Sequence, residues 1–228
     1  MVGWQRPSST FFSCLPLLSF CATMGPTMSE RYLEGIREHP EISRQDICLL
    51  RRHLPDARRI VDIGCGQGGF LGLCGGEFEL AVGLDLSAEA VRMCLARGVS
   101  GIRSHALFLP LRTASVDVVR AKDIIEHLPD PLSMVREAYR VLRPGGLFLA
   151  YVPSQYSVLY PVGNFYDDYT HVRPLSRFGA RRLVEDSGFE LLLIHGYTAG
   201  RNKLERGAGR LLALILPYAW RILRRRAL

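Results

Sequence analysis

The chain has 228 residues, 48% of them hydrophobic, which is enough for one α/β domain with a buried core and a short appendage. Its formal net charge is +7. Eight of the 29 basic residues but only one of the 22 acidic residues lie within 201–228, so the other 200 residues are formally neutral. This distribution excludes a basic nucleic-acid-binding face over the body of the domain, and it indicates a balanced domain with a basic tail.

The six cysteines include no C-x-x-C pair and no zinc spacing, and Cys65 lies inside a glycine-rich turn. We therefore expect reduced thiols and a cytoplasmic protein. Residues 1–28 differ from the rest and include a short apolar stretch over 11–22. One interpretation is a secretory signal, but no clean small-x-small cleavage site follows it. We favour a disordered extension, or an over-long start with translation beginning at Met24 or Met28.

The main domain is expected over residues 29–200 and opens with two helices. A short helix is predicted over 29–39, and Pro40 is interpreted as an interruption after it. A second helix is predicted over 43–54, because its apolar residues recur on one face.

The most informative stretch is 59–70, which reads R-I-V-D-I-G-C-G-Q-G-G-F. An apolar run contains the acid Asp62, glycines then alternate at Gly64, Gly66 and Gly68, and a helix-compatible segment follows. Glycine permits a sharp turn and lets a ligand lie against bare backbone, and the next helix begins with unpaired N–H groups. In doubly wound proteins this order of strand, turn and helix forms a site for a nucleotide-like cofactor.

The next strand, predicted over 79–85, ends in Asp85, which lies 21 residues after Gly64. A carboxylate at the end of a second strand can accept hydrogen bonds from both hydroxyls of a ribose. Ser87 is a suitable N-cap for the following helix, which leaves the Asp85 carboxylate available to a ligand.

Strands and helices continue to alternate, which predicts an α/β fold with a doubly wound, mostly parallel sheet. Further strands are predicted over 101–106, 116–121, 147–152 and 189–195. Helices are predicted over 70–75, 87–97, 131–142 and 175–187. Residues 154–174 form a long loop rich in tyrosine, aspartate and asparagine, where a substrate site is expected.

The D-x-G-x-G-x-G pattern over 62–68 resembles motif I of the class I S-adenosylmethionine-dependent methyltransferases. The A-L-F-L-P-L segment at 106–111 and the R-P-G-G turn at 143–146 are similar to the same family, and the matches cover about 58–153. The resemblance implies a Rossmann-like methyltransferase that uses S-adenosyl-L-methionine as its cofactor.

The resemblance also implies a set of cofactor-binding residues. In this family an acid after the third strand contacts the adenine amino group, and here His105 stands in its place, so backbone and apolar contacts at Ala106 and Leu107 are expected to hold the adenine. The expected cofactor-binding residues are Asp62, Gly64, Gly66, Gly68, Asp85, Leu86, His105, Ala106, Leu107 and Lys122.

Methyl transfer to a hydroxyl requires a general base. The candidate catalytic residues are His127, after the fourth strand, and His171, in the long loop, with Asp168 as an orienting partner. Packing or capping for His127 and solvent exposure for His171 are the alternatives. The segment D-x-x-E-H over 123–127 is similar to an acidic E-x-x-E-H cluster that binds a divalent metal in quinone-pathway O-methyltransferases. Because aspartate replaces the first glutamate, we expect no metal.

The seventh, antiparallel strand usual in this family is not evident after Gly196. Residues 210–228 are instead predicted to form a helix, kinked at Pro217, within a basic tail over 201–228. The apolar run before Arg221 is too short to span a bilayer. The helix either lies on an anionic membrane surface or packs on the sheet edge.

We therefore expect a methyltransferase acting at oxygen on a small molecule or on a glycan- or lipid-linked acceptor. The D-D-Y-T-H-V-R-P segment at 167–174 resembles methyltransferases encoded with polysaccharide assembly enzymes. The alternative is a catalytically degenerate methyltransferase-fold subunit at the membrane, supported by His105 and the missing strand. A nicotinamide-dependent reductase is disfavoured by the glycine spacing. The expected location is the cytoplasm, including the inner face of the membrane, and nucleic acid is not an expected partner.

Overall fold

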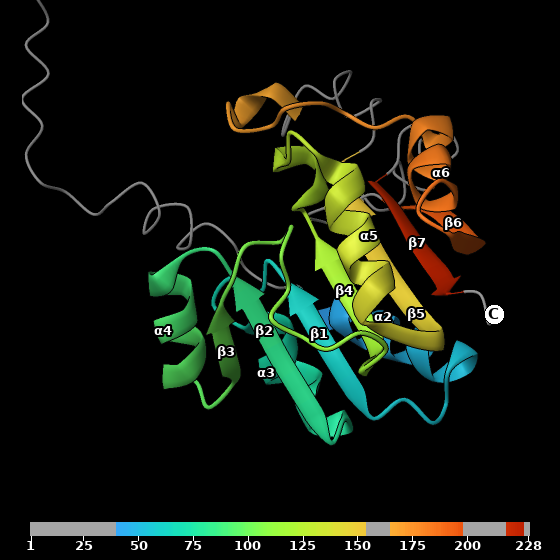
Figure 1. The fold of residues 1–228 in the computed structure, drawn as a ribbon. Helices are drawn as coiled ribbons and strands as arrows, with labels where there is room; N and C mark the ends of the chain where they lie inside the picture. Colours follow the sequence, from blue (N-terminus) through green and yellow to red (C-terminus); the bar gives the residue numbers. More distant parts are fainter. Residues whose placement is uncertain (1–39, 154–164, 198–217, 226–228) are drawn as a thin grey trace, which may run out of the picture.

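A computed structural model describes residues 40–153, 165–197 and 218–225 (Figure 1). Within these ranges seven strands form one sheet in the order β3-β2-β1-β4-β5-β7-β6. The strands are β1 Arg59–Ile63, β2 Leu80–Asp85, β3 Ser100–Arg103, β4 Val116–Lys122, β5 Leu142–Val152, β6 Phe189–Tyr197 and β7 Tyr218–Arg225. The first five are parallel, and the strand order reverses between β1 and β4. The predicted doubly wound, mostly parallel sheet is confirmed, and its switch point lies beside the glycine turn.

Helices and short 3-10 turns connect the strands. They are α2 Pro40–His53, α3 Gly69–Cys74, η1 Gly75–Glu77, α4 Ala88–Ala96, η2 Ile125–His127, α5 Pro131–Val141, η4 Phe165–Asp167 and α6 Arg177–Glu185. Three helices begin at a side chain that accepts a hydrogen bond from a backbone N–H of the first turn, namely Ser87, Asp130 and Ser176. These caps explain why the predicted starts of α4, α5 and α6 agree with the structure to within two residues.

The sheet has a hydrophobic layer on each face, because side chains alternate along each strand. On one face Val61 and Val119 pack in the cluster that contains the buried residues of α5 and Val184 of α6. On the other face Ile60 and Val118 pack with α2 and α3. Figure 1 shows α5 and α6 in front of the sheet, with α2 and α3 behind it.

Several boundaries differ from the predicted ones, and the physical reason is clear for two of them. Pro40 is predicted to interrupt the chain after the helix expected over 29–39, but it is the first residue of helix α2. Proline is well suited to the first helical position, because no intrahelical N–H bond is lost there. The helix predicted over 29–39 lies outside the described residues. Strand β5 starts at Leu142 and includes the R-P-G-G segment, because a register shift lets Leu142 pair with Val116 and Leu147 pair with Val118.

The helix predicted over 210–228 is wrong for residues 218–225. These residues form β7, antiparallel to β5 on one side and to β6 on the other. The local sequence is compatible with a helix, but β5 and β6 each present an open edge, and pairing both edges satisfies backbone groups that would otherwise need other partners. The proposed membrane contact of the tail stays a prediction only for residues outside this strand. No helix within the described ranges is long and apolar enough to cross a bilayer.

Asp117 ties the amino-terminal end of β1 to β4 and β5. Its Oδ2 accepts hydrogen bonds from the backbone N–H groups of Arg58 and Arg59, at 2.7 and 2.8 Å, and its Oδ1 accepts one from Arg143 Nε. Burial alone would raise the pKa of Asp117, but these three donors outweigh burial and lower the pKa below its usual value.

We expect Asp117→Asn to reduce the free energy of unfolding by about 1–3 kcal/mol at pH 7, because an amide leaves buried donors without an acceptor. A carboxyl with a lowered folded pKa stabilises the protein above its unfolded pKa of about 3.9, and this contribution is lost as the pH falls. Urea unfolding at several pH values should therefore show the difference between wild type and variant shrinking below about pH 4. The exposed Asp186→Asn is the control. A difference that grows toward low pH would contradict this interpretation.

Candidate functional site

The glycine turn follows β1 and lies against the end of β2. Gly64 N and Cys65 N donate to Leu84 O at 2.8 and 3.1 Å. Gly64 and Gly66 have φ angles of 70° and 52°, a region that favours glycine. A Cβ at Gly64 would lie 2.9 Å from Ile124 Cδ1, whereas a Cβ at Gly66 would have nothing within 4 Å. The turn is therefore packed tightly at Gly64 and is open to a ligand at Gly66.

Asp85 is hydrogen-bonded directly to this turn. Its Oδ2 accepts from Gly66 N at 2.9 Å, and its Oδ1 accepts from Ser87 N at 2.8 Å. Ser87 Oγ accepts a hydrogen bond from Ala90 N at 3.2 Å and caps the helix, as the sequence predicts. Asp85 nevertheless makes hydrogen bonds of its own to the nearby backbone. A carboxylate has about four lone-pair positions, so it can hold the turn and still accept from two ligand hydroxyls.

Asp62 is buried behind the turn and paired with an arginine that the sequence analysis missed. Arg120 Nη1 lies 3.1 Å from Asp62 Oδ1, and Arg120 Nε lies 3.1 Å from Asp46 Oδ2 on α2. The Arg120 guanidinium also lies 4.0 Å from the centre of the Phe70 ring. The sequence does contain a signal for this ion pair, because an arginine inside a buried strand needs a partner and Arg120 pairs in register with Asp62. Whether Asp62 also contacts a cationic ligand stays a prediction.

The loop after β3 carries the residues expected to contact adenine. His105 is exposed, and its Nδ1 accepts a hydrogen bond from Leu107 N at 3.1 Å. Ala106 is buried in the core layer beside α5, and Leu107 packs against the same layer. Ser104 N donates to Asp85 O at 2.8 Å, so this loop begins next to the Asp85 carboxylate.

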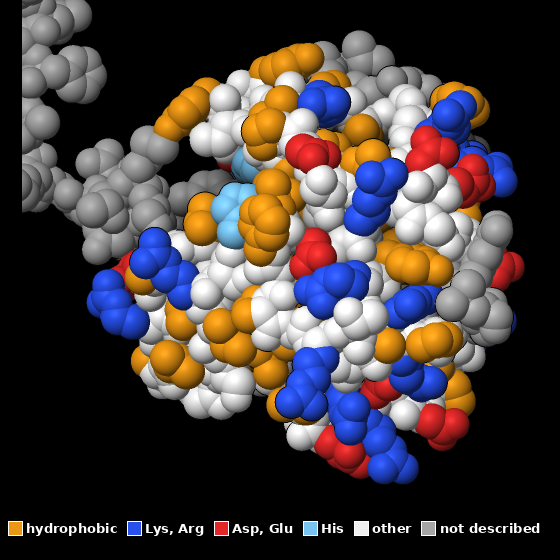
Figure 2. All heavy atoms as spheres, in the orientation of Figure 1, with side chains coloured by type: hydrophobic (Ala, Val, Ile, Leu, Met, Phe, Trp, Pro, Cys, Tyr) orange, Lys and Arg blue, Asp and Glu red, His pale blue; other side chains and the backbone are white. Residues whose placement is uncertain are grey.

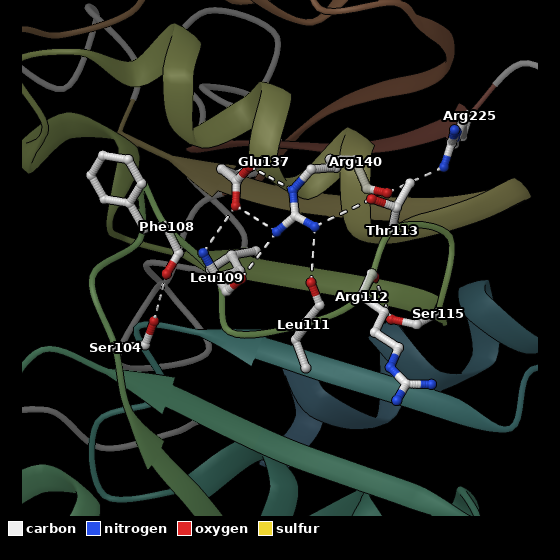
Figure 3. Close-up of polar contacts among 10 residues, drawn as sticks. All are labelled: Ser104, Phe108, Leu109, Leu111, Arg112, Thr113, Ser115, Glu137, Arg140 and Arg225. Carbon is white, nitrogen blue, oxygen red and sulfur yellow. Dashed lines mark hydrogen bonds and ion pairs between the residues drawn. The ribbon is translucent and has the colours of Figure 1, made fainter.

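Two residues of α5 hold the same loop in place (Figure 3). Glu137 Oε2 accepts from Leu109 N at 2.9 Å. Arg140 donates to Leu109 O and Leu111 O at 3.0 and 2.9 Å, and its Nε lies 2.7 Å from Glu137 Oε1. The Arg140 hydrogen bonds lower the pKa of Glu137, which is therefore ionised at neutral pH. We call Glu137 and Arg140 the loop clamp.

The predicted catalytic residues lie together beyond the carboxyl end of β4. The ring centres of His127 and His171 are 4.6 Å apart. His127 Nδ1 lies 2.8 Å from Thr170 Oγ1, which donates to Asp168 Oδ1 at 2.6 Å. Asp168 Oδ2 lies 3.9 Å from His171 Nε2. The structure thus brings together three residues that lie up to 44 positions apart in the sequence.

Hydrophobic side chains border this region. Figure 2 shows histidine side chains flanked by hydrophobic ones on this face of the molecule. Tyr166 and Tyr169, close to Asp168 in the chain, are exposed by 62% and 76%, and Phe108, beside His105 in the loop after β3, is exposed by 77%. Leu86 is also exposed, and Lys122 Nζ lies 3.4 Å from Asp123 Oδ2.

Comparison with known proteins identifies the family. Residues 61–150 match the family described as "Methyltransferase domain". A probable S-adenosylmethionine-dependent methyltransferase of Mycolicibacterium smegmatis is 33% identical over 196 residues, which cover 81% of this chain and 74% of that protein. The chain belongs to the S-adenosylmethionine-dependent methyltransferases.

The other similarities agree with this assignment. The crystal structure of a methyltransferase from Archaeoglobus fulgidus has a TM-score of 0.67 to this methyltransferase at 21% identity, covering 87% of this chain and all of the other. This likeness confirms the fold. A ubiquinone biosynthesis O-methyltransferase of Serratia proteamaculans is 33% identical over 99 residues, which cover 39% of this chain and 40% of that protein.

The cofactor of the methyltransferase is S-adenosylmethionine, as the sequence analysis expected. The residues present fit this cofactor, because Gly66 offers open backbone next to the Asp85 carboxylate. The individual cofactor contacts expected of Gly64, Gly66, Gly68, Asp85, Leu86, His105, Ala106, Leu107 and Lys122 stay predictions. The glycine turn, Asp85 and the start of the loop after β3 nevertheless lie along one edge of the sheet, where a single ligand can reach them.

Proposed function

We propose that this methyltransferase transfers the methyl group to a hydroxyl of a small molecule or of a glycan- or lipid-linked acceptor. The observation that supports an oxygen acceptor is the grouping of His127, His171 and Asp168. This group lies beyond the carboxyl end of β4, at the edge of the sheet that carries the glycine turn and Asp85. Such groups are suited to binding a hydroxyl and assisting loss of its proton. The exposed aromatic rings Tyr166 and Tyr169 lie in the same segment and could stack on a sugar or apolar acceptor.

Bound S-adenosylmethionine supplies a methyl group that its sulfonium charge already activates. The protein has to align the acceptor oxygen with that methyl group and exclude water, and alignment alone can lower the barrier by about 7–11 kcal/mol. The exposed aromatic side chains of Tyr166 and Tyr169 are suited to holding an acceptor for this purpose. The acceptor would therefore be recognised mainly by shape and stacking.

The competing proposal, a methyltransferase-fold subunit that binds without catalysis, has lost part of its support. The apparent absence of a seventh strand favoured it, but β7 is present. The replacement of the adenine-contacting acid by His105 remains in its favour. Calorimetric binding of S-adenosylmethionine together with turnover of an acceptor would exclude it.

The proposed function is tested by incubating the purified chain with methyl-labelled S-adenosylmethionine and cell-extract fractions, followed by separation of lipid and aqueous phases. We expect label in an alkali-stable methyl ether within the lipid, glycan or small-molecule fractions. Label that enters only protein or nucleic acid would contradict the proposed acceptor class. A His127→Ala, His171→Ala double variant should bind the cofactor normally and transfer the label more slowly.

The loop clamp provides a separate prediction about cofactor affinity. Removing the Glu137 carboxylate frees Leu109 N and deprives Arg140 of its partner, so the loop that would hold adenine loses its fixed position. We expect Glu137→Ala to weaken S-adenosylmethionine binding by about 1–2 kcal/mol, or roughly 5- to 30-fold in Kd. Calorimetry measures this, with Glu185→Ala, from the exposed pair with Arg181, as the control. A Kd within twofold of the wild-type value would show that the clamp does not position the loop.

A further inference from the structure

Glu126, His127 and His171 form a compact group of side chains that can bind a metal ion. One ligand atom from each lies within 4.8 Å of the others. Glu126 and His127 lie on η2, directly after β4, whereas His171 arrives from the segment after η4. Val172 N donates to Glu126 O at 2.8 Å, which fastens the two segments together at this point.

The hydrogen bonds of the two histidines determine which ring nitrogen carries the lone pair. His171 Nδ1 lies 2.6 Å from Phe165 O, and a carbonyl can only accept, so Nδ1 carries a hydrogen and the neutral ring has its lone pair on Nε2. Thr170 Oγ1 uses its hydrogen on Asp168 Oδ1, so it accepts from His127 Nδ1. His127 Nε2 then also carries a lone pair.

Glu126 supplies the second, independent observation. Its side chain is buried, with 1% of the residue exposed, and neither carboxyl oxygen has a hydrogen-bond partner among the described residues. Leaving such a group buried without a partner is costly. A bound cation would satisfy both oxygens.

We propose that Glu126 and the Nε2 atoms of His127 and His171 bind a divalent transition-metal ion such as Zn²⁺, Mn²⁺ or Co²⁺. Two imidazoles and one carboxylate favour these ions over Mg²⁺ or Ca²⁺, which prefer all-oxygen sites. Three protein ligands leave coordination positions for water or substrate. Phe165 O holds His171 Nδ1, and Thr170 Oγ1, which is itself bonded to Asp168, holds His127 Nδ1, as outer-shell groups do in metal sites.

This site differs from the linear acidic motif seen in the sequence, and it reverses the expectation of no metal. Asp123 is not part of the group, and its Oδ2 lies beside Lys122 Nζ. The third ligand is His171, 44 residues after His127, and sequence spacing alone gives no reason to connect them. In this arrangement the histidines are ligands rather than the proton acceptors that the sequence predicts.

The catalytic use of the site rests on the proposed O-methylation. A hydroxyl bound to the cation loses its proton to solvent more readily, because the positive charge stabilises the alkoxide. The new O–CH₃ bond then forms as the S–CH₃ bond breaks, and the thioether leaves with the electron pair of that bond. The cation is neither oxidised nor reduced.

Titration of the full chain with Co²⁺, without S-adenosylmethionine, tests the site independently of the reaction. We expect visible absorption bands that saturate at one Co²⁺ per chain. His171→Ala and Glu126→Gln should weaken binding at least about tenfold, and Thr170→Val, at an exposed position, should weaken it about 10- to 100-fold by releasing His127 Nδ1. His53→Ala, outside the group, is the control, and Cys48→Ser excludes binding at the exposed thiol.

Absence of stoichiometric Co²⁺ binding, or binding that these variants leave unchanged, would overturn the site. Circular dichroism and urea unfolding verify that each variant is folded, and Thr170→Val carries the test where the buried Glu126 variant does not fold. Calorimetry with S-adenosylmethionine and the label-transfer assay are separate measurements. A chain that binds cofactor and transfers label without any metal would refute the catalytic role of the cation while leaving the proposed function intact.

Discussion

Replacing Arg120 by methionine is expected to reduce the free energy of unfolding by about 3–5 kcal/mol, the usual cost of removing one member of a buried ion pair. The Arg120 side chain is 3% exposed, and it lies against two carboxylates that are themselves buried, Asp46 and Asp62. Methionine fills a similar volume but leaves both acids without their guanidinium partner. Urea unfolding followed by circular dichroism measures the loss.

Arg92→Met is the matched control, because Arg92 is paired with Glu89 on the exposed face of α4. We expect the free energy of unfolding of that variant to lie within about 0.5 kcal/mol of the wild-type value. Arg120→Lys should also be destabilised, since one ammonium cannot reproduce the two directions in which Nε and Nη1 donate. Equal stability of the Arg120 and Arg92 variants would show that the ion pairs of Arg120 with Asp46 and Asp62 make no net contribution to stability.

Gly66→Ala is expected to weaken S-adenosylmethionine binding strongly while affecting stability only modestly. A side chain at a φ of 52° costs about 1–2 kcal/mol of folding free energy. The new Cβ would also project into the open space where the ligand is expected, and such an overlap costs about 1–3 kcal/mol of binding, or roughly 5- to 150-fold in Kd. Calorimetric titration and urea unfolding separate the two effects.

Gly98→Ala controls for backbone strain. Gly98 has a φ of 74° and open space around it, like Gly66, but it lies between α4 and β3, away from the glycine turn. We expect it to lose similar stability and to bind S-adenosylmethionine with unchanged affinity. If both variants lost affinity equally, the effect of Gly66→Ala would be explained by destabilisation and not by contact with the ligand.

The parallel half of the fold could be predicted because its signals are local. In β1 and β4 the hydrophobic residues form buried runs, the turn after β1 needs glycine, and Ser87, Asp130 and Ser176 are recognisable helix caps. Each of these features depends on a few neighbouring residues. The contact between the glycine turn and Asp85 was also within reach, because adjacent parallel strands end at the same edge of a sheet.

The features that the sequence analysis missed depend on residues far apart in the chain. Strand β7 is defined by the edges of β5 and β6, and nothing within residues 218–225 requires an extended backbone. The approach of His171 to His127 depends on how the chain returns after β5. The pairing of Arg120 with Asp62 could be predicted only by aligning β1 with β4 and asking which acid lies next to a buried arginine. In each case tertiary contact outweighs local preference.

Cofactor binding is expected to depend above all on the carboxylate of Asp85, acting with the glycine turn. Calorimetric titration of wild type and of the isosteric Asp85→Asn variant with S-adenosylmethionine tests this most directly. We predict that the variant stays folded and that its affinity falls by about 1.5–3 kcal/mol, or roughly 10- to 150-fold in Kd, because hydrogen bonds to the charged group are lost. An unchanged Kd would contradict the proposed role of the Asp85 carboxylate in holding the cofactor.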